Sequence, residues 1–291
     1  METSELIKKV RKIEIKTRGL SKQLFSGEYH SAFKGRGMAF SEVREYMQGD
    51  DIRTIDWNVT ARLRNPYIKI FEEERELTVM LLVDISGSQS FGTQDKFKRE
   101  LITELAAILS FSALLNNDKI GLILFSDKVE KYIPPKKGKS HVLRIIRELI
   151  EFKPENTGTD IGGALAYLTN VIRKKAIVFI MSDFISPDFE KPLKIAGSKH
   201  DTIAMQIYDE SEESLPDLGI IKINDAESRE EMWIDSSSSK VRNEYSRWWE
   251  LKEKELKFLF NKNKIDMIKI RTNESYISPL MNFFKKRESR R

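Results

Sequence analysis

The stretch that decides the fold is TVMLLVDISGSQS at residues 78–90. From Val79 to Val83 every residue is apolar, which is typical of a strand that is buried on both faces of a parallel sheet. An acid, Asp84, follows the apolar run, and two hydroxyls come at alternate positions, Ser86 and Ser88. Because a carboxylate and two hydroxyls make poor core residues and good ligands, the end of this strand is predicted to bind a ligand.

Further along the chain, short apolar runs recur between segments whose apolar residues have helical spacing. The apolar runs lie at residues 119–125, 175–182, 202–208 and 265–270. Helices are expected at residues 95–116, 139–151 and 161–173. Apolar strands that alternate with helices predict an α/β fold of the Rossmann type, with a mostly parallel central sheet flanked by helices.

The segment before the first of these strands has a different character. Residues 1–77 are expected to contribute a helix near 3–18, then a charged segment, and a strand near 66–73. All of this is expected to pack on the core formed by residues 78–291.

The alternation of strands and helices also breaks late in the chain. GIIKIND and EMWID predict a small antiparallel β insertion near residues 215–238. A long helix is expected at 240–262, and further C-terminal structure ends in KKRESRR, which is expected to be a charged tail.

The bulk composition excludes several classes of protein. The net charge is only +5, because 50 basic residues nearly balance 45 acidic ones, so no nucleic-acid partner is expected. No cysteine is present, which excludes disulfides and cysteine-based metal sites. No apolar run approaches the roughly 20 residues that span a bilayer, and the N-terminus lacks the apolar core of a signal peptide. A cytoplasmic protein without an integral membrane segment is therefore expected.

Two more oxygen ligands are expected close to Asp84. Asp183 ends the third apolar run, and Thr159 stands in NTGTDIGGAL, just before a predicted helix. The carboxyl ends of parallel strands meet at one edge of the sheet, where ligands bind at a reversal of strand order. Carboxylate and hydroxyl oxygens select hard divalent cations, which predicts Mg²⁺ or Mn²⁺. Ordinary turn chemistry is the alternative for Asp84 and its serines, and Thr157 is a rival for the role of Thr159.

This set of oxygen donors resembles the metal-ion-dependent adhesion site of von Willebrand factor A domains. The matching residues are Asp84, Ser86, Ser88, Thr159 and Asp183. The resemblance covers about residues 78–210 and implies a Rossmann-like sheet with Mg²⁺ at its carboxyl edge. It implies that Asp183 acts directly or through water, and that an acid side chain from a partner protein completes the coordination.

The flanks of that region resemble a bacterial family, domain of unknown function 58. GRGMAFSEVREYMQGDDIRTIDWNVTAR upstream and HDTIAMQIYDESEESLPDLG downstream carry the similarity, which extends along nearly the whole chain. Members are typically encoded beside MoxR-type AAA+ ATPases. The resemblance therefore implies an adaptor or co-chaperone that works with such an ATPase, with a client protein, or with both.

The upstream segment is itself a second candidate site, because many charges surround one tryptophan. Trp and Arg dominate the energetic centres of protein interfaces. The predicted partner surface comprises Arg44, Asp50, Arg53, Asp56, Trp57 and Arg62. The alternative is an internal ion-pair network that packs this segment on the sheet, and the two interpretations are compatible.

The favoured function is thus metal-dependent protein–protein interaction without catalysis. The alternative is a Mg²⁺-dependent hydrolase, because acids at strand ends also hold Mg²⁺ in phosphoryl-transfer enzymes. Such enzymes usually add an aspartate two residues from another acid, and a lysine. The position two after Asp84 is Ser86, which disfavours this alternative. No glycine-rich phosphate-binding motif is present either.

A histidine beside acids, His200-Asp201, invites a catalytic interpretation that we consider weaker than a structural one. A strand-entry hydrogen bond is expected for His200. The acids that follow the same strand, Asp209, Glu212 and Glu213, are expected to lie in a solvated loop.

Overall fold

The computed structural model describes residues 10–11, 13–14, 17, 38–73, 76–87, 98–156, 158–186, 188–224 and 231–290. The chain forms two compact units. Unit 1 comprises Met1–Ala32 and Thr78–Arg291, and unit 2 comprises Phe33–Leu77. The expected packing of residues 1–77 on the core stays a prediction.

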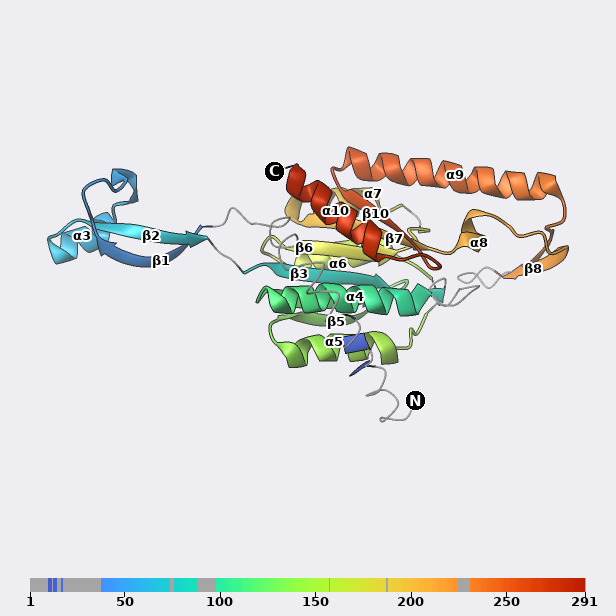
Figure 1. The fold of residues 1–291 in the computed structure, drawn as a ribbon, viewed down its shortest axis with the longest axis horizontal. Helices are drawn as coiled ribbons and strands as arrows, with labels where there is room; N and C mark the ends of the chain where they lie inside the picture. Colours follow the sequence, from blue (N-terminus) through green and yellow to red (C-terminus); the bar gives the residue numbers. More distant parts are fainter. Residues whose placement is uncertain are drawn as a thin grey trace. The chain divides into compact units, whose positions relative to one another are not determined.

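Unit 1 is built on a six-stranded sheet (Figure 1). Its strands are β3 (Thr78–Asp84), β4 (Lys119–Phe125), β5 (Val129–Lys136), β6 (Ile177–Ser182), β7 (Asp201–Tyr208) and β10 (Asp266–Arg271). They lie in the order β10-β7-β6-β3-β4-β5, and every neighbouring pair is parallel except β4 with β5. This is the Rossmann-type order, so the predicted fold class is confirmed.

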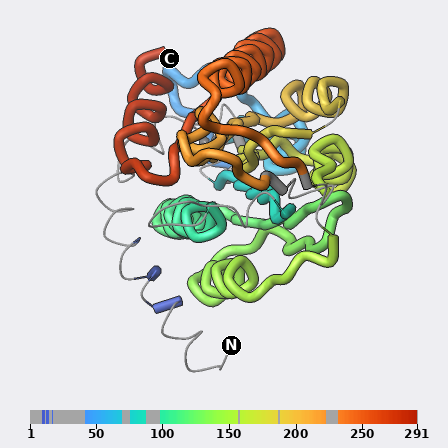
Figure 2. Tube along the Cα trace, turned by 90° about the vertical axis from the view of Figure 1, so that its right-hand side faces the viewer, coloured from blue at the N-terminus to red at the C-terminus, as the bar shows by residue number. Residues whose placement is uncertain are grey.

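Helices cover both faces of this sheet. They are α4 (Lys98–Leu115), α5 (Lys139–Glu151), α6 (Ile161–Val171), α7 (Glu190–Lys199), α8 (Glu210–Glu213), α9 (Ser239–Lys262) and α10 (Ile277–Ser289). Figure 2 shows α4, α5 and α10 on one face and α6, α7 and α9 on the other. The central strands β3, β4 and β6 are buried almost throughout. Burial on both faces explains why these strands have continuous apolar runs.

Some elements of unit 1 differ from the expectations. Strand β5 was not predicted, because Pro134 and Pro135 argue against a strand in the interior of a sheet. The prolines are tolerated here because β5 lies at the edge. The charged end KKRES is no tail, because it forms the last turns of α10. Arg287 in this helix pairs with Asp201 and with Asp266, 2.9 Å from Nε to Oδ2 in the second case. The expected helix at 3–18 lies mostly outside the described residues.

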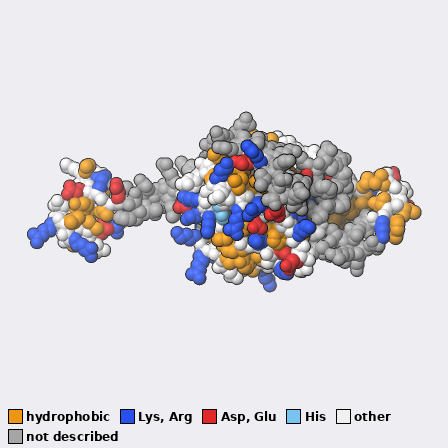
Figure 3. Space-filling model, turned by 90° about the horizontal axis from the view of Figure 1, so that it is seen from below, with side chains coloured by type: hydrophobic (Ala, Val, Ile, Leu, Met, Phe, Trp, Pro, Cys, Tyr) orange, Lys and Arg blue, Asp and Glu red, His pale blue; other side chains and the backbone are white. Residues whose placement is uncertain are grey.

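A small antiparallel hairpin departs from the main sheet, as predicted. It consists of β8 (Ile220–Asn224) and β9 (Glu231–Asp235). Large apolar side chains at this hairpin are exposed, among them Leu218, Ile220, Met232 and Trp233. Figure 3 shows the hydrophobic surface that they form at the right-hand end of the view. Among the described residues, no helix combines the length and apolar character needed to cross a bilayer.

Unit 2 is a β-hairpin with two short helices between its strands. Its elements are β1 (Met38–Glu45), η1 (Ile52–Thr54), α3 (Trp57–Leu63) and β2 (Tyr67–Glu73), with β1 and β2 antiparallel. Asp56 caps α3 by accepting hydrogen bonds from the backbone N–H groups of Asn58 and Val59. Arg64 ends the helix with a left-handed backbone (φ 63°).

Candidate metal centre

The sheet brings Asp84 and Asp183 together at the point where its strand order reverses. From β3 the chain moves outward through β4 and β5, and it then returns to the other side of β3 as β6. β3 and β6 are parallel neighbours, with Val83 opposite Met181. Asp84 closes β3 and Asp183 follows the last residue of β6. The two carboxylates therefore meet at the carboxyl edge, where α/β sheets bind ligands.

Asp84 is held in place by two serines. Its Oδ1 accepts a hydrogen bond from the Ser86 backbone N–H at 2.9 Å, and its Oδ2 accepts one from Ser182 Oγ at 2.6 Å. The Ser182 hydroxyl oxygen in turn accepts a hydrogen bond from the Phe184 backbone N–H at 3.0 Å. Asp84 is only 1% exposed. Burial raises the pKa of Asp84 to about 7, and repulsion by Asp183 adds to this shift, while the serine hydrogen bonds oppose it.

Asp183 is equally buried, and it contacts a cation that the sequence did not point to. Its Oδ1 accepts the Ile185 N–H at 3.2 Å. Its Oδ2 lies 3.3 Å from Nζ of Lys98, the first residue of α4, whose side chain has no exposed surface. Burial lowers the pKa of Lys98, but attraction by Asp183 and Glu212 outweighs it and leaves the pKa raised. The ammonium therefore stays charged inside the protein.

Glu212 is the second partner of Lys98. It lies on α8, where its Oε2 accepts the Asp209 N–H at 2.9 Å, and its Oε1 bonds Lys98. Asp209 is also buried, and its Oδ2 accepts the Thr272 hydroxyl at 2.6 Å. The expectation of a solvated loop is thus wrong for Asp209 and Glu212. A capping box orders both of them at the start of α8.

The cluster holds more negative than positive charge. When ionised, Asp84, Asp183 and Glu212 carry three negative charges against the single charge of Lys98, which leaves two. Burial raises the pKa of Glu212 as well, with the attraction of Lys98 opposing it. Fully ionised, the cluster would thus lack two positive charges, which a divalent cation would supply. The donor set therefore fits a hard metal ion.

Acids alone do not complete such a site. Within the described ranges, no three acid or histidine side chains converge closely enough to hold a metal. Glu212 bonds Lys98, which in turn bonds Asp183. A metal ion held by the two aspartates would take its other ligands from hydroxyls, waters or a group from outside the chain, as the sequence predicted for a site with two carboxylates.

The hydroxyl residues are placed unequally. Ser86 is buried beside Asp84. Thr159 is buried just before α6, and its carbonyl accepts the Ser186 hydroxyl at 3.1 Å, which joins its loop to the one that follows Asp183. Ser88 and Thr157 lie outside the described residues, so the choice between Thr157 and Thr159 stays open.

A residue with strained backbone follows Asp183. Phe184 has a positive φ of 60°, which is unusual for a bulky side chain. Its ring lies against those of Phe260 and Phe189, with centroids 5.1 Å and 6.2 Å away. Strained backbone persists only where the surroundings fix it, and such residues cluster at functional sites.

The six residues of the predicted partner surface lie in unit 2. Three of them, Arg44, Asp50 and Asp56, make hydrogen bonds within the unit, and the other three are exposed. Arg44 and Asp50 form a two-pronged ion pair, with bonds of 2.8 Å and 2.7 Å, and this pair lowers the pKa of Asp50. Asp56 serves as the cap of α3. Trp57, Arg53 and Arg62 are exposed, with Trp57 69% exposed. The segment thus combines an internal ion pair with a solvent-facing tryptophan.

His200 has a structural position, away from the metal-centre residues in sequence. It is buried at the start of β7, and the Ala176 N–H donates to its Nδ1 at 3.3 Å. Its Nε2 has no hydrogen-bond partner within the described structure. Burial, and to a lesser degree the nearby charge of Lys199, lowers the pKa of His200 to about 4.

Comparisons with known proteins give several relatives. The "Uncharacterized protein Rv1480" of Mycobacterium tuberculosis is 28% identical over 231 residues, 78% of this chain and 73% of that protein. The "Uncharacterized protein YeaD" of Bacillus subtilis is 30% identical over 109 residues, 38% of this chain and 25% of that protein.

Solved structures with similar chain traces include the conserved hypothetical protein BatB from Bacteroides thetaiotaomicron, with a TM-score of 0.49, 15% identity and coverage of 73% of this chain and 99% of that one. The SpRpn10 VWA domain has a TM-score of 0.40, 12% identity and coverage of 72% and 95%. The family model described as "Protein of unknown function DUF58" matches residues 42–255. Because this match spans most of the sequence, the chain belongs to the DUF58 family.

Proposed function

We propose that this protein is a metal-dependent protein-interaction module and not an enzyme. The observation that carries the proposal is the buried pair Asp84 and Asp183 at the strand-order reversal. Asp84, Ser86 and Thr159, with Ser88, would hold Mg²⁺ or Mn²⁺, and Asp183 would act directly or through water. Such an ion can accept one further oxygen ligand from a partner.

The partner is proposed to offer a carboxylate. A site with two protein carboxylates and hydroxyls keeps coordination positions for water or a borrowed ligand. The resemblance stated above favours a MoxR-type AAA+ ATPase, a client protein, or both as the source of that acid. The cytoplasmic location expected from the sequence is part of the same proposal.

The proposal is tested by recovery of the MoxR-type ATPase of the same organism on the immobilised full chain. Recovery by the wild type is compared in Mg²⁺ and in EDTA. The test variant is Asp84→Asn. Asp188→Asn makes the same substitution at an exposed residue and is the matched control. We expect Mg²⁺-dependent recovery by the wild type and by Asp188→Asn, and none by Asp84→Asn. Equal recovery in Mg²⁺ and EDTA would refute the proposal.

One observation favours the hydrolase alternative. Lys98 lies beside Asp183, and phosphoryl-transfer hydrolases usually place a lysine beside their acids. Two features oppose it: Ser86 replaces the expected second aspartate, and the Lys98 ammonium is already engaged by two carboxylates. Turnover of p-nitrophenyl phosphate that requires Mg²⁺ and disappears in Asp84→Asn would support the hydrolase instead.

A further inference from the structure

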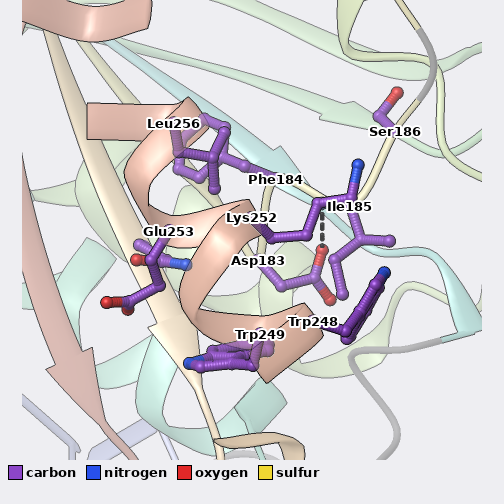
Figure 4. A pocket seen from close by; sticks show the side chains of 10 residues that line it. Asp183, Phe184, Ile185, Ser186, Trp248, Trp249, Lys252, Glu253 and Leu256 are labelled. Carbon is purple, nitrogen blue, oxygen red and sulfur yellow. Dashed lines mark hydrogen bonds between the residues drawn. The ribbon is translucent and has the colours of Figure 1, made fainter. Parts of the chain in front are cut away.

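Lys98 connects the candidate metal centre to the short helix α8. Its Nζ lies 3.3 Å from Oδ2 of Asp183 and is also bonded to Oε1 of Glu212, a residue of α8. The other oxygen of Asp183, Oδ1, accepts the Ile185 backbone N–H at 3.2 Å, a bond that Figure 4 shows as a dashed line. A charged group of α4 thus contacts both an acid of the metal centre and an acid outside it.

Lys98, Asp183 and Glu212 interact strongly because little water reaches them. The side chains of Lys98 and Asp183 have no exposed surface, and that of Glu212 is 15% exposed. Charges that are screened so weakly attract and repel each other more than charges at a surface do. An ammonium buried here without any carboxylate would be strongly destabilised, so Lys98 has to stay bonded to at least one of the two acids.

The charge of Lys98 opposes a metal ion at Asp183. In the function proposed above, Asp183 ligates the ion directly or through water. Two cations close to one buried carboxylate repel each other. This repulsion falls if the ammonium leaves Asp183 and keeps only its bond to Glu212, and that single carboxylate still satisfies the buried charge.

Glu212 is held in the position that such a shift requires. Its Oε2 accepts the Asp209 backbone N–H at 2.9 Å as part of the capping box of α8, while its Oε1 bonds Lys98. Glu213, the next residue, pairs instead with Arg271 on β10. Neighbouring glutamates of α8 are thus bonded to two different cations, which makes Glu213 a matched control for Glu212.

We propose that Lys98 sets the metal affinity of the centre by moving between Asp183 and Glu212. In the metal-free protein the ammonium bonds both acids, and with metal bound it stays with Glu212. The proposal deepens the function proposed above and rests on it, because it concerns the same centre. Glu212 then determines metal affinity without being a ligand. Because coupling acts in both directions, α8 in turn responds to metal binding.

The test is isothermal titration of Mg²⁺ into the full chain with acetate present. Glu212→Gln should weaken Mg²⁺ binding about tenfold, as expected for the loss of a hydrogen bond between charged groups. The neutral amide holds the ammonium less well, so Lys98 stays on Asp183. Lys98→Met should strengthen binding about tenfold or more, because a buried positive charge beside the ion is removed.

Combining the two substitutions separates a shift of Lys98 from the plain charge of Glu212. In the Lys98→Met background there is no ammonium to hold, so Glu212→Gln should weaken binding by no more than about threefold. Glu213→Gln is the matched control. It should leave the affinity within about twofold of wild type, since the Glu213 side chain is 41% exposed and its charge is screened.

Equal weakening by Glu212→Gln in the wild-type and Lys98→Met backgrounds would overturn the proposal, because Glu212 would then act through its charge alone. If Lys98→Met does not fold, Glu212→Gln and Glu213→Gln still decide, and equal affinities of these two variants would overturn the proposal. Either result would leave the metal centre standing. An absence of Mg²⁺ binding by the wild type would instead refute the metal centre and this proposal together.

Discussion

Nζ of Lys98 lies 3.3 Å from Oδ2 of Asp183, and neither side chain has exposed surface. Lys98 therefore provides an internal cation beside the candidate metal centre. It neutralises part of a cluster whose three carboxylates would otherwise repel each other. In the metal-free protein this ammonium balances Asp183, and in the proposed function a bound metal ion would share that role.

Replacement of Lys98 by methionine should destabilise the metal-free protein by about 3–5 kcal/mol, because one member of a buried ion pair is removed. Mg²⁺ should recover more stability in Lys98→Met than in the wild type, since the ion then meets more uncompensated charge. Urea unfolding in EDTA and in Mg²⁺ measures both effects. Lys252→Met, at a half-exposed lysine of α9, is the control. A loss that Mg²⁺ does not reduce would show that Lys98 has no role in metal binding.

Asp84→Asn should leave the stability of the metal-free protein within about 1 kcal/mol of wild type or raise it. The substitution removes the repulsion with Asp183, and the side chain keeps hydrogen-bonding groups for Ser86 and Ser182. Asp209→Asn provides the contrast, because the Asp209 carboxylate accepts from Ser211 and Thr272 and caps α8. That variant should lose about 1–3 kcal/mol. If both variants lose the same amount in urea unfolding, Asp84 is a structural residue.

His200 should make the protein less stable as the pH falls. Its pKa is lowered to about 4 in the folded protein, from an ordinary value near 6.5. Between these values the unfolded chain binds the proton and the folded protein does not, so stability present above pH 6.5 is lost on acidification. The His200 contribution to the loss from pH 7 to pH 5 should be about 2 kcal/mol. Asp84, whose pKa is raised to about 7, contributes with the opposite sign, so the His200 share is the difference between wild type and His200→Asn in urea unfolding across this range. Equal pH dependence of the two proteins would contradict the assignment.

Trp57→Ala should weaken partner binding without unfolding unit 2. Its side chain is 69% exposed, so stability should change by no more than about 0.5 kcal/mol. If Trp57 anchors the interface, its removal should weaken binding by about 2 kcal/mol, which is roughly thirtyfold in affinity. Phe258→Ala on α9 is a control of similar exposure. Equal affinity of Trp57→Ala and wild type for the MoxR-type ATPase would remove unit 2 from the proposed interface.

The central sheet was predictable because burial on both faces leaves a simple pattern. The observed bounds of β3 and β4 match the apolar runs at 78–84 and 119–125. The meeting of Asp84 and Asp183 followed from the same pattern, since parallel strands end at one edge. Edge strand β5 did not follow from it, because an edge strand with two prolines has no continuous apolar run.

Lys98 and Glu212 could not be predicted as members of the site. A lysine at the start of a helix and a glutamate in a charged loop are usually solvated. They are 114 positions apart in sequence, and Asp183 is 85 positions from Lys98. Only the packing of α4 and α8 at the sheet edge brings them together.

The most direct test of the central claim is isothermal titration of Mg²⁺ and Mn²⁺ into the full chain, with acetate present as a stand-in for the partner carboxylate. The wild type and Asp188→Asn should bind one ion, and Asp84→Asn should bind none. Binding that survives in Asp84→Asn, or no binding by the wild type with acetate present, would contradict a metal centre at Asp84 and Asp183.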